Sequence, residues 1–561
     1  MTASVTERTG STGERGGSAR ERAETFTGTF RLARLALRRD RVQLPSWLLG
    51  LTAVTGLVAS SMSGLYGTER EQAAYARSNA ASAVSRVFNG IVPEPNLGAV
   101  ITAETFSLLA VLAALMNVFA VVRHTRQNEE TGRAEMIGAT VVGRHAPLTA
   151  ALLVALGTDA ALAVLVAAAL VAAGLPAAGS LLLGAAIGAT GAAFAGVAAV
   201  TAQICESARA ANGIASASLG LAYLLRGAGD GLAEPGADGL TASSLWPSWL
   251  SPLGWGQQAQ PFAADRPWPL LLHAALLAAL VAAAYRLTDH RDVGTGMLPV
   301  RRGPATAPRA LLSPLGLAWR LQRGVLYGWA AGMLVVGAML GAVGDQAEEL
   351  LGTSDGLTEA IGKLGGTGDL VDVYFAAMLG LTGVIVAGYT VQALLRMRAE
   401  ETGPLEAVLA TAVSRPRWMA SHIVCAVAGT AVVLAVHGLA NAVAYCVAAG
   451  SADRLPALLG AAMVQLPATL TLAGFVIAAI GLLPKWSVAI SWAALTACVL
   501  IGQVGPIVEL PQWAANVSPY THTPALPSSD LTAAPLVALG AVAAVLAAAG
   551  LVSFRRRDLT F

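Results

Sequence analysis

Long apolar runs, bounded by charged residues, glycine or proline, dominate the chain after its first 25 or so residues. A helix needs roughly 20 apolar residues to cross a bilayer, and most of these runs are that long. The fifth and eleventh runs are shorter, so we expect them to be tilted, extended or partly re-entrant. The predicted spans lie near 44–66, 99–122, 146–173, 180–203, 211–226, 268–287, 324–344, 372–395, 418–449, 457–482, 486–502 and 533–553.

The composition agrees with this pattern. Only 12% of the 561 residues are charged, 55% are hydrophobic, and the mean hydropathy is +0.62. A water-facing surface needs about a quarter of the residues to be charged, so a cytosolic enzyme, a nucleic-acid-binding protein and a disordered protein are excluded. The four cysteines show no CxxC spacing, which argues against a disulfide framework or a zinc site. We therefore expect an all-α, polytopic membrane protein with twelve transmembrane helices.

Basic residues are distributed unevenly between the predicted loops. Twelve spans place both termini on one side, and most of the 36 basic residues fall on that side. Because cytoplasmic loops are enriched in Lys and Arg, both termini are expected to be cytoplasmic. The polar first residues lack an apolar core and predict a disordered tail. The predicted divisions are a tail at 1–26, a six-helix half at 27–293, a linker at 294–316 and a second six-helix half at 317–561.

A polar segment after the second predicted span recurs after the eighth. Residues 129–144 and 400–415 are identical at nine of sixteen positions at a constant offset of 271, and both begin Glu-Glu-Thr-Gly. We call them the first and second repeat segments. A Ser-Pro pair before the last span of each half, at 251 and 518, and an Arg-Asp pair after it, at 291 and 557, follow the same order. The halves are therefore expected to be parallel repeats, related by an axis along the membrane normal.

Two interpretations of the repeat segments are open. In the first, Thr131 and Thr402 each start and cap a short helix that has acidic residues in its first turn, where the helix dipole favours them. In the second, each segment is a recognition site, since a retained loop residue more often serves binding than packing. A short helix with an acidic start and an apolar continuation would then dock into a groove on a partner.

With these motifs, the chain resembles the permease subunit of a type-2 ATP-binding-cassette (ABC) exporter, in particular the fused, double-length permeases of actinobacterial antibiotic exporters. In that class the loop after the second span is a coupling helix that docks on the ATPase. The resemblance implies amphipathic helices at 27–43 and 310–322 and extracellular segments at 227–267 and 503–532. It places coupling residues at Glu129, Glu130, Thr131, Gly132 and Glu135, and at Glu400, Glu401, Thr402, Gly403 and Glu406. Pro404 stands where the first copy has Arg133, so the two docking sites are not expected to be equivalent.

The implied function is export of a hydrophobic or amphipathic small molecule, such as an antibiotic, a drug or a lipid-like compound, across a bacterial plasma membrane. The chain has no Gly-x-x-x-x-Gly-Lys-Ser/Thr phosphate loop. We therefore expect no cofactor in this chain, with ATP and Mg held by two copies of a soluble ABC ATPase partner. The other expected contacts are the lipid bilayer and the transported molecule, with no nucleic acid.

Two other functions are compatible with a chain of many membrane spans. A proton-coupled secondary drug transporter also commonly has twelve spans, but the loop after the second span lacks the Gly-x-x-x-Asp-Arg-x-Gly-Arg-Arg turn of the major facilitator class. An integral-membrane transferase would need an acidic or histidine catalytic set at a membrane face, and none is visible in the sequence.

A few ionisable or polar side chains fall within the predicted spans, where insertion of a charge costs roughly 2.5–3.5 kcal/mol. Asp159 lies near the middle of the third span, and His437 and Asn441 are one turn apart in the ninth. They either line a pathway or gate, or form interhelical hydrogen bonds that hold the helices together. Glu104 and Asp372, near the outer ends of the second and eighth spans, either rim an outer gate or are solvated span ends.

Overall fold

The structure is a computed structural model that describes residues 25–292, 294–297, 303, 305–344, 369–401, 403, 405–503 and 510–558. The regular elements among these residues are helices, with no β-strand. The chain divides into two compact units, Met1–Arg302 and Gly303–Phe561, each described here by itself. The predicted tail at 1–26 lies almost entirely outside the described residues, as does part of the predicted linker.

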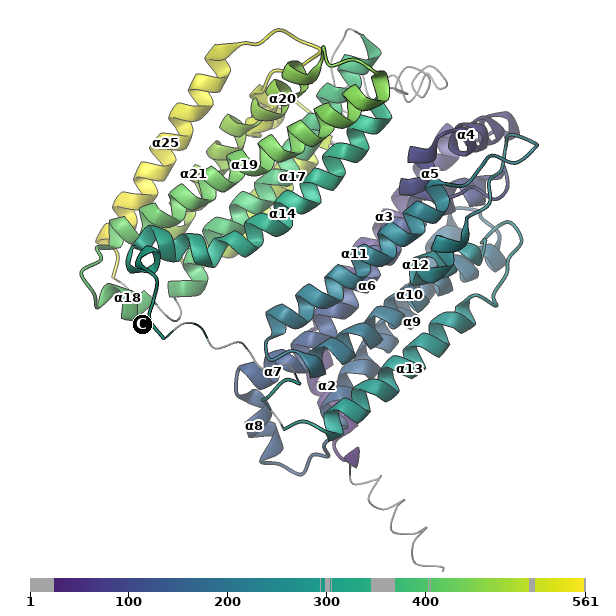
Figure 1. The fold of residues 1–561 in the computed structure, drawn as a ribbon, viewed down its shortest axis with the longest axis horizontal. Helices are drawn as coiled ribbons and strands as arrows, with labels where there is room; N and C mark the ends of the chain where they lie inside the picture. The colour runs from purple at the N-terminus through teal and green to yellow at the C-terminus, as the bar shows by residue number, and fades with distance from the viewer. Residues whose placement is uncertain are drawn as a thin grey trace, which may run out of the picture. The chain divides into compact units, whose positions relative to one another are not determined.

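The first unit is a bundle of long helices with short helices at both ends (Figure 1). Its long helices are α3 (Gln43–Leu65), α6 (Leu97–His124), α9 (Ala146–Ala172), α10 (Ala177–Ile204), α11 (Ala208–Gly231) and α13 (Leu270–Asp289). At one end lie α2 (Thr29–Arg39), α7 (Arg126–Glu130) and α8 (Arg133–Gly138), and at the opposite end lie α4 (Glu69–Ala81) and α5 (Ala83–Asn89). The short helices η1 (Trp246–Leu250) and α12 (Pro252–Gln258) follow α11. Helix α10 packs against α6, α9 and α13 and forms the centre of this unit.

The second unit contains η2 (Arg309–Leu312), α14 (Pro314–Gly344), α17 (Leu370–Glu401), α18 (Leu405–Leu409), α19 (Arg415–Ala449), α20 (Leu455–Met463), α21 (Leu466–Leu482), α22 (Ser487–Gln503), α24 (Gln512–Ala515), η3 (Pro519–His522) and α25 (Ala533–Arg556). The prediction of a separate amphipathic helix at 310–322 is wrong. The Ser313 side chain accepts a hydrogen bond from the Gly316 amide at 3.0 Å, and one continuous helix follows from Pro314. Proline favours a helix start, and nothing in the following residues interrupts the helix before Gly344.

Ten helical segments within the described residues are long and apolar enough to cross a membrane when α20 and α21 are taken together as one, and all ten coincide with predicted spans. The fifth and eleventh predicted spans form α11 and α22, which do not meet that measure. Helix α11 continues well past the predicted end at 226, because Arg226 and Asp230 are buried and form an ion pair with each other. The tenth span is broken between α20 and α21, and Pro467, the second residue of α21, has no backbone N–H to continue the hydrogen bonds of α20.

Glycines allow close helix contacts in both units. A side chain at Gly184 of α10 would collide with the backbone of Ala163 in α9, and one at Gly341 of α14 would collide with the backbone of Asn441 in α19. In a bilayer, where lipid tails are as apolar as leucine, such close contact provides much of the attraction between helices. The glycine-rich composition therefore has a packing role at these crossings.

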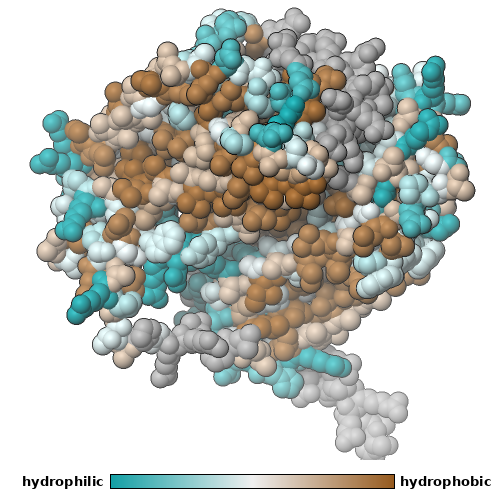
Figure 2. All heavy atoms as spheres, turned by 45° about the horizontal axis from the view of Figure 1, so that its top comes forward, coloured by the Kyte–Doolittle hydropathy of each residue, from teal (hydrophilic) through white to brown (hydrophobic). Residues whose placement is uncertain are grey.

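Large apolar side chains remain exposed along the sides of the long helices. Leu49 and Leu57 of α3, and Val537 and Val545 of α25, are each more than 60% exposed. Hydrophobic residues cover much of the surface seen in Figure 2. A surface of this kind is unfavourable in water and suits hydrocarbon, so the fold is that of a polytopic helical membrane protein.

Candidate functional site

The first repeat segment forms two short helices after α6. The Thr131 hydroxyl donates to the Gln127 carbonyl at 2.8 Å and closes α7, and Gly132 follows with a φ of 73°. This left-handed conformation suits glycine and turns the chain into α8. No side chain caps the start of α8, so the interpretation that Thr131 starts a helix is wrong. Thr402 and Pro404, the corresponding positions of the second segment, lie outside the described residues.

Glu129 fastens α7 to the chain that follows α13. Its carboxylate accepts two hydrogen bonds from Arg291, at 2.5 and 2.8 Å, and one from Arg126 at 2.6 Å. The side chains of Arg126 and Arg291 are 1% and 7% exposed, and that of Glu129 is 12% exposed. The neighbouring Glu130 accepts a hydrogen bond from the Ala208 amide at the start of α11, at 3.1 Å. Glu129 and Glu130 are therefore both engaged within the first unit.

The second repeat segment has the same ion pair, displaced by one residue. Glu401 pairs with Arg398 and with Arg557, which follows α25. Glu400, which the sequence alignment matches to Glu129, instead pairs with Arg396 at 3.2 Å and with His422 at 3.3 Å. Glu401, which is aligned with Glu130, thus forms the ion pairs that correspond to those of Glu129.

A second contact, a hydrogen bond from the arginine at the end of each repeat segment, occurs at aligned positions in the two units. Arg144 donates to the carbonyl of Arg291 at 2.7 Å, and Arg415 donates to the carbonyl of Arg557 at 2.8 Å. In both units, therefore, the repeat segment is attached to the arginine after the last long helix.

The remaining predicted coupling residues lie on the outside. Thr131 and Glu135 are exposed in the first unit, and Gly403 and Glu406 are exposed in the second. The apolar continuation differs between the units. Helix α8 has no buried residue, and its Met136 is 68% exposed. Helix α18 buries Leu405 fully, and the adjacent Val408, Leu409 and Val413 pack against the core of the second unit.

Sequence reasoning missed Asp40, which follows α2. Its carboxylate accepts from Arg123 at 2.7 Å and lies 2.6 Å from His124 Nε2, and its side chain is 2% exposed. Together with a hydrogen bond from Arg39 to Asn128 of α7 at 2.9 Å, it holds α2 against the end of α6 and the start of α7. A single acid within the arginine-rich stretch 31–41 was the available signal, but its partners lie more than 80 residues away.

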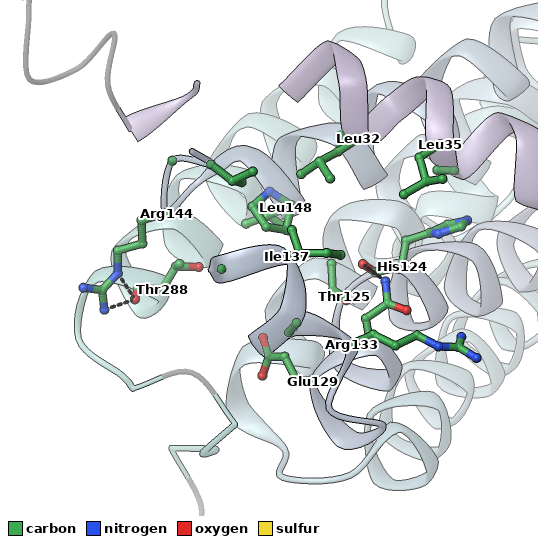
Figure 3. Close-up of a pocket in the computed structure, with 18 of the residues that line it drawn as sticks. Leu32, Leu35, His124, Thr125, Glu129, Arg133, Ile137, Arg144, Leu148 and Thr288 are labelled. Carbon is green, nitrogen blue, oxygen red and sulfur yellow. Dashed lines mark hydrogen bonds between the residues drawn. The ribbon is translucent and has the colours of Figure 1, made fainter. Parts of the chain in front are cut away.

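A cavity of about 780 Å³ lies between α2 and the first repeat segment. Figure 3 shows Leu32 and Leu35 of α2 on one side, Ile137 and Arg133 of α8 on the other, and Leu148 nearby. A hollow of about 730 Å³ adjoins it on the side of Met136 and Val141.

A family model described as "Multidrug efflux system permease Rv1217c, C-terminal domain" matches residues 32–286 and 311–555. The chain belongs to this family. The multidrug efflux system permease protein Rv1217c of Mycobacterium tuberculosis is 39% identical to it over 562 residues, covering 100% of both chains. Both repeat segments fall within the matched regions. As a permease, the protein is a transporter and not a catalytic enzyme, and its apolar helices make it multi-pass.

In this permease the polar residues of the predicted spans are engaged mainly by neighbouring helices. Asp159 of α9 accepts from the Asn117 amide of α6 at 2.7 Å. His437 contacts the Thr382 hydroxyl at 2.8 Å and the Met333 carbonyl at 3.1 Å, but it does not bond to Asn441, whose buried side-chain amide has no hydrogen-bond partner. These contacts join helices. Whether any of these residues also lines a pathway stays a prediction.

Two acids lie at the predicted outer ends of the permease. Glu104 accepts from the Tyr75 hydroxyl of α4 and from Asn89 at 2.9 Å. Burial and then the Glu104 charge raise the pKa of the Tyr75 phenol well above its usual value. Asp372 accepts from Arg454 at 2.7 Å, and Arg454 also donates to Asp369 at 2.6 Å. Each acid is a link between elements, and a gating role for either stays a prediction.

Proposed function

We propose that this permease is the transmembrane subunit of an ATP-driven type-2 ABC exporter. In this proposal two copies of a soluble ABC ATPase dock on the two repeat segments, and ATP and Mg are bound by those partners. The chain lies in a bacterial plasma membrane with both termini in the cytoplasm. The cargo is a hydrophobic or amphipathic small molecule, in keeping with the printed name of the 39% identical relative, a multidrug efflux system permease protein.

The observation that carries the proposal is the ion pair present in both units between a repeat-segment glutamate and the arginine after the last long helix. Glu129 pairs with Arg291, and Glu401 pairs with Arg557. A docking segment can pass a conformational change of the ATPase to the transmembrane helices only if it is firmly attached to those helices. A charge-assisted pair that is largely shielded from water provides such an attachment, because breaking it leaves a charge without its partner.

The contacts between the long helices also support the internal repeat. Helix pairs α6 and α9, α6 and α10, and α10 and α13 of the first unit are matched by α17 and α19, α17 and α21, and α21 and α25 of the second. The two fastened segments belong to equivalent places in these arrangements. Two segments at equivalent places would give two docking events per chain, although the two docking sites differ in sequence.

The contact with the ATPase is assigned to the outer face of each segment. In the first unit this face carries Glu135, Met136 and Val141, and all three are exposed. At the offset of 271 the second unit has Glu406, followed by Ala407 and Ala412. The charge is therefore kept while the apolar bulk is lost, which makes the first segment the stronger of two unequal docking sites.

The test is co-purification of the tagged, full-length permease with its ATPase from the native host. Reversing both exposed acids, Glu135→Lys with Glu406→Lys, is expected to remove the ATPase and abolish efflux of ethidium from cells. Glu234→Lys, at an exposed acid in the predicted extracellular segment 227–267, is the matched control and is expected to leave both unchanged. Intact ATPase binding in the double variant would overturn the docking assignment. Efflux that survives ATP depletion but stops when the proton gradient is collapsed would favour a secondary transporter.

A further inference from the structure

The cavity between α2 and the first repeat segment is not needed for the docking face proposed above. Figure 3 shows Leu32, Leu35 and Ile137 directed toward it. Glu135 is absent from the residues that line it. We call the 780 Å³ cavity together with the adjoining hollow the α2–α8 groove; Met136 and Val141 of the docking face line only the hollow and not the cavity.

The groove lies at the ends of membrane-spanning helices. Helix α6 ends at His124 and α9 begins at Ala146, and both ends contribute to its walls. Helix α2 runs directly before the first span and exposes Phe30 by 83% and Leu35 by 54%. An amphipathic helix of this kind lies along a membrane surface with its apolar face in the lipid boundary. The groove is therefore within reach of lipid.

The charge around the groove is strongly positive. Four arginines, Arg31, Arg34, Arg38 and Arg133, line the outer hollow, and no acid lines it. Two acids line the inner cavity, Glu129 and Asp292, but Glu129 is occupied by Arg126 and Arg291, and Asp292 is exposed. Within residues 25–292, Arg31, Arg34, Arg38 and Arg133 form no ion pair. The cations are therefore available to an anion from outside the chain.

Arg39, which also lines the cavity, lies close enough to Arg133 and Arg123 to be affected by their charges. Burial, then the nearby charges of Arg133 and Arg123, lower the pKa of the Arg39 guanidinium. An anion placed among these arginines would relieve their mutual repulsion. Arginine is suited to this role because its planar group donates two parallel hydrogen bonds to a phosphate.

The second unit closes the corresponding space with its own side chains. Leu405 of α18 is fully buried, and Val408 and Leu409 pack against the core. Pro404 replaces Arg133 there. In the first unit, α8 has no buried residue. The repeat segment of the second unit therefore packs on the protein core. That of the first unit covers a groove that has basic walls and an apolar floor and is not filled by side chains.

We propose that the α2–α8 groove binds one anionic phospholipid, with its phosphate between Arg38 and Arg133 and an acyl chain over Leu32, Leu35 and Ile137. Basic pockets beside membrane helices are suited to anionic headgroups, and several hundred cubic ångströms accommodate a headgroup with part of a chain. The lipid would fill the space beneath α8 that α18 fills with leucine and valine. A protein partner is disfavoured for the inner cavity, because none of the docking-face residues Glu135, Met136 and Val141 lines it.

The test uses purified full-length permease and measures retained lipid by native mass spectrometry after exposure to phosphatidylglycerol or phosphatidylcholine. Wild-type protein is expected to retain one phosphatidylglycerol more tightly than phosphatidylcholine. Arg38→Ala with Arg133→Ala is expected to weaken that binding about thirtyfold, since each arginine at an anionic surface contributes about 1 kcal/mol, or about fivefold in affinity. The matched control, Arg320→Ala with Arg323→Ala, removes two exposed arginines of α14 and is expected to change nothing.

Ile137→Trp provides a second variant that keeps every charge and fills the apolar floor. It is expected to lower phosphatidylglycerol binding while leaving the thermal unfolding midpoint unchanged. Inorganic phosphate tests whether the site recognises only a phosphate group or a whole lipid. At millimolar concentration it should fail to displace phosphatidylglycerol from the permease. Equal retention of phosphatidylcholine, competition by phosphate alone, or unchanged binding in both variants would overturn the proposal. Loss of ATPase co-purification with normal lipid binding in Glu135→Lys/Glu406→Lys would leave this inference intact, so the two proposals can fail separately.

Discussion

Removing the Glu129 carboxylate tests whether the first repeat segment is fastened to the bundle as the structure indicates. Glu129→Ala would leave Arg126 and Arg291, whose side chains are 1% and 7% exposed, facing each other without a counter-ion. Breaking a buried pair by removing one partner costs about 3–5 kcal/mol. The lower end applies here, because Arg126 still donates to the carbonyls of Ala202 and Thr295.

The expected effect is local opening of α7 and α8, which rest on this pair. A loss of about 3 kcal/mol corresponds to amide exchange about 150-fold faster in that segment. Hydrogen-exchange mass spectrometry of the full-length permease in detergent, on peptides covering 126–138, measures it directly. Peptides from α9 and α10 should exchange at their wild-type rate, because neither helix depends on Glu129 for its backbone hydrogen bonds.

Glu135→Ala is the matched control, since it removes an exposed acid from the same segment and is expected to change stability by less than about 0.5 kcal/mol. Glu129→Ala with Arg291→Ala should recover part of the loss, because the double variant leaves one fewer unpaired charge. Equal exchange rates in Glu129→Ala and Glu135→Ala would refute the reasoning. They would mean that α7 and α8 are held by other contacts.

Two further outcomes follow from the second unit. Gly341→Leu is expected to lower the thermal unfolding midpoint by overpacking against Asn441, at a cost of about 1–3 kcal/mol. Gly332→Leu on the same helix, where a side chain meets open space, should have little effect. Equal midpoints in the two variants would contradict the close crossing of α14 and α19. The Arg454 hydrogen bond lowers the pKa of Asp369, so this pair stabilises the fold above the unfolded pKa of about 4 and is lost as the pH falls through the lower folded value. The loss of helical circular dichroism with falling pH should therefore be less steep in Arg454→Gln than in the wild type. An unchanged profile would mean that the Arg454–Asp369 pair does not contribute to the pH dependence of stability.

The positions of the membrane helices were accessible from the sequence because they depend on local composition. A run of about 20 apolar residues forms its backbone hydrogen bonds within itself and needs no distant partner. All ten helices that are long and apolar enough to span coincide with predicted runs. The predicted helix at 310–322 failed for a local reason as well, since α14 continues through its expected end without a breaking residue.

The bonding of the repeat segments was only partly accessible. Alignment found both segments but paired Glu129 with Glu400, whereas the ion pairs relate Glu129 to Glu401. An alignment scores identity position by position, but an ion pair depends on where an arginine arrives in space. Arg291 is 162 residues from Glu129 in the chain. The partners of Asp40 were missed for the same reason.

The sequence by itself determined a multi-pass, all-helical chain with two similar acidic segments, because hydrophobic runs and repeated motifs are properties of neighbouring residues. Only the tertiary structure decided which glutamates are fastened inward, which acids remain exposed, and that one segment covers a basic groove while the other is seated on leucine and valine. These outcomes depend on burial and on the meeting of side chains distant in the chain. The free energy of a charge changes most when it leaves water, and that change is set by the fold.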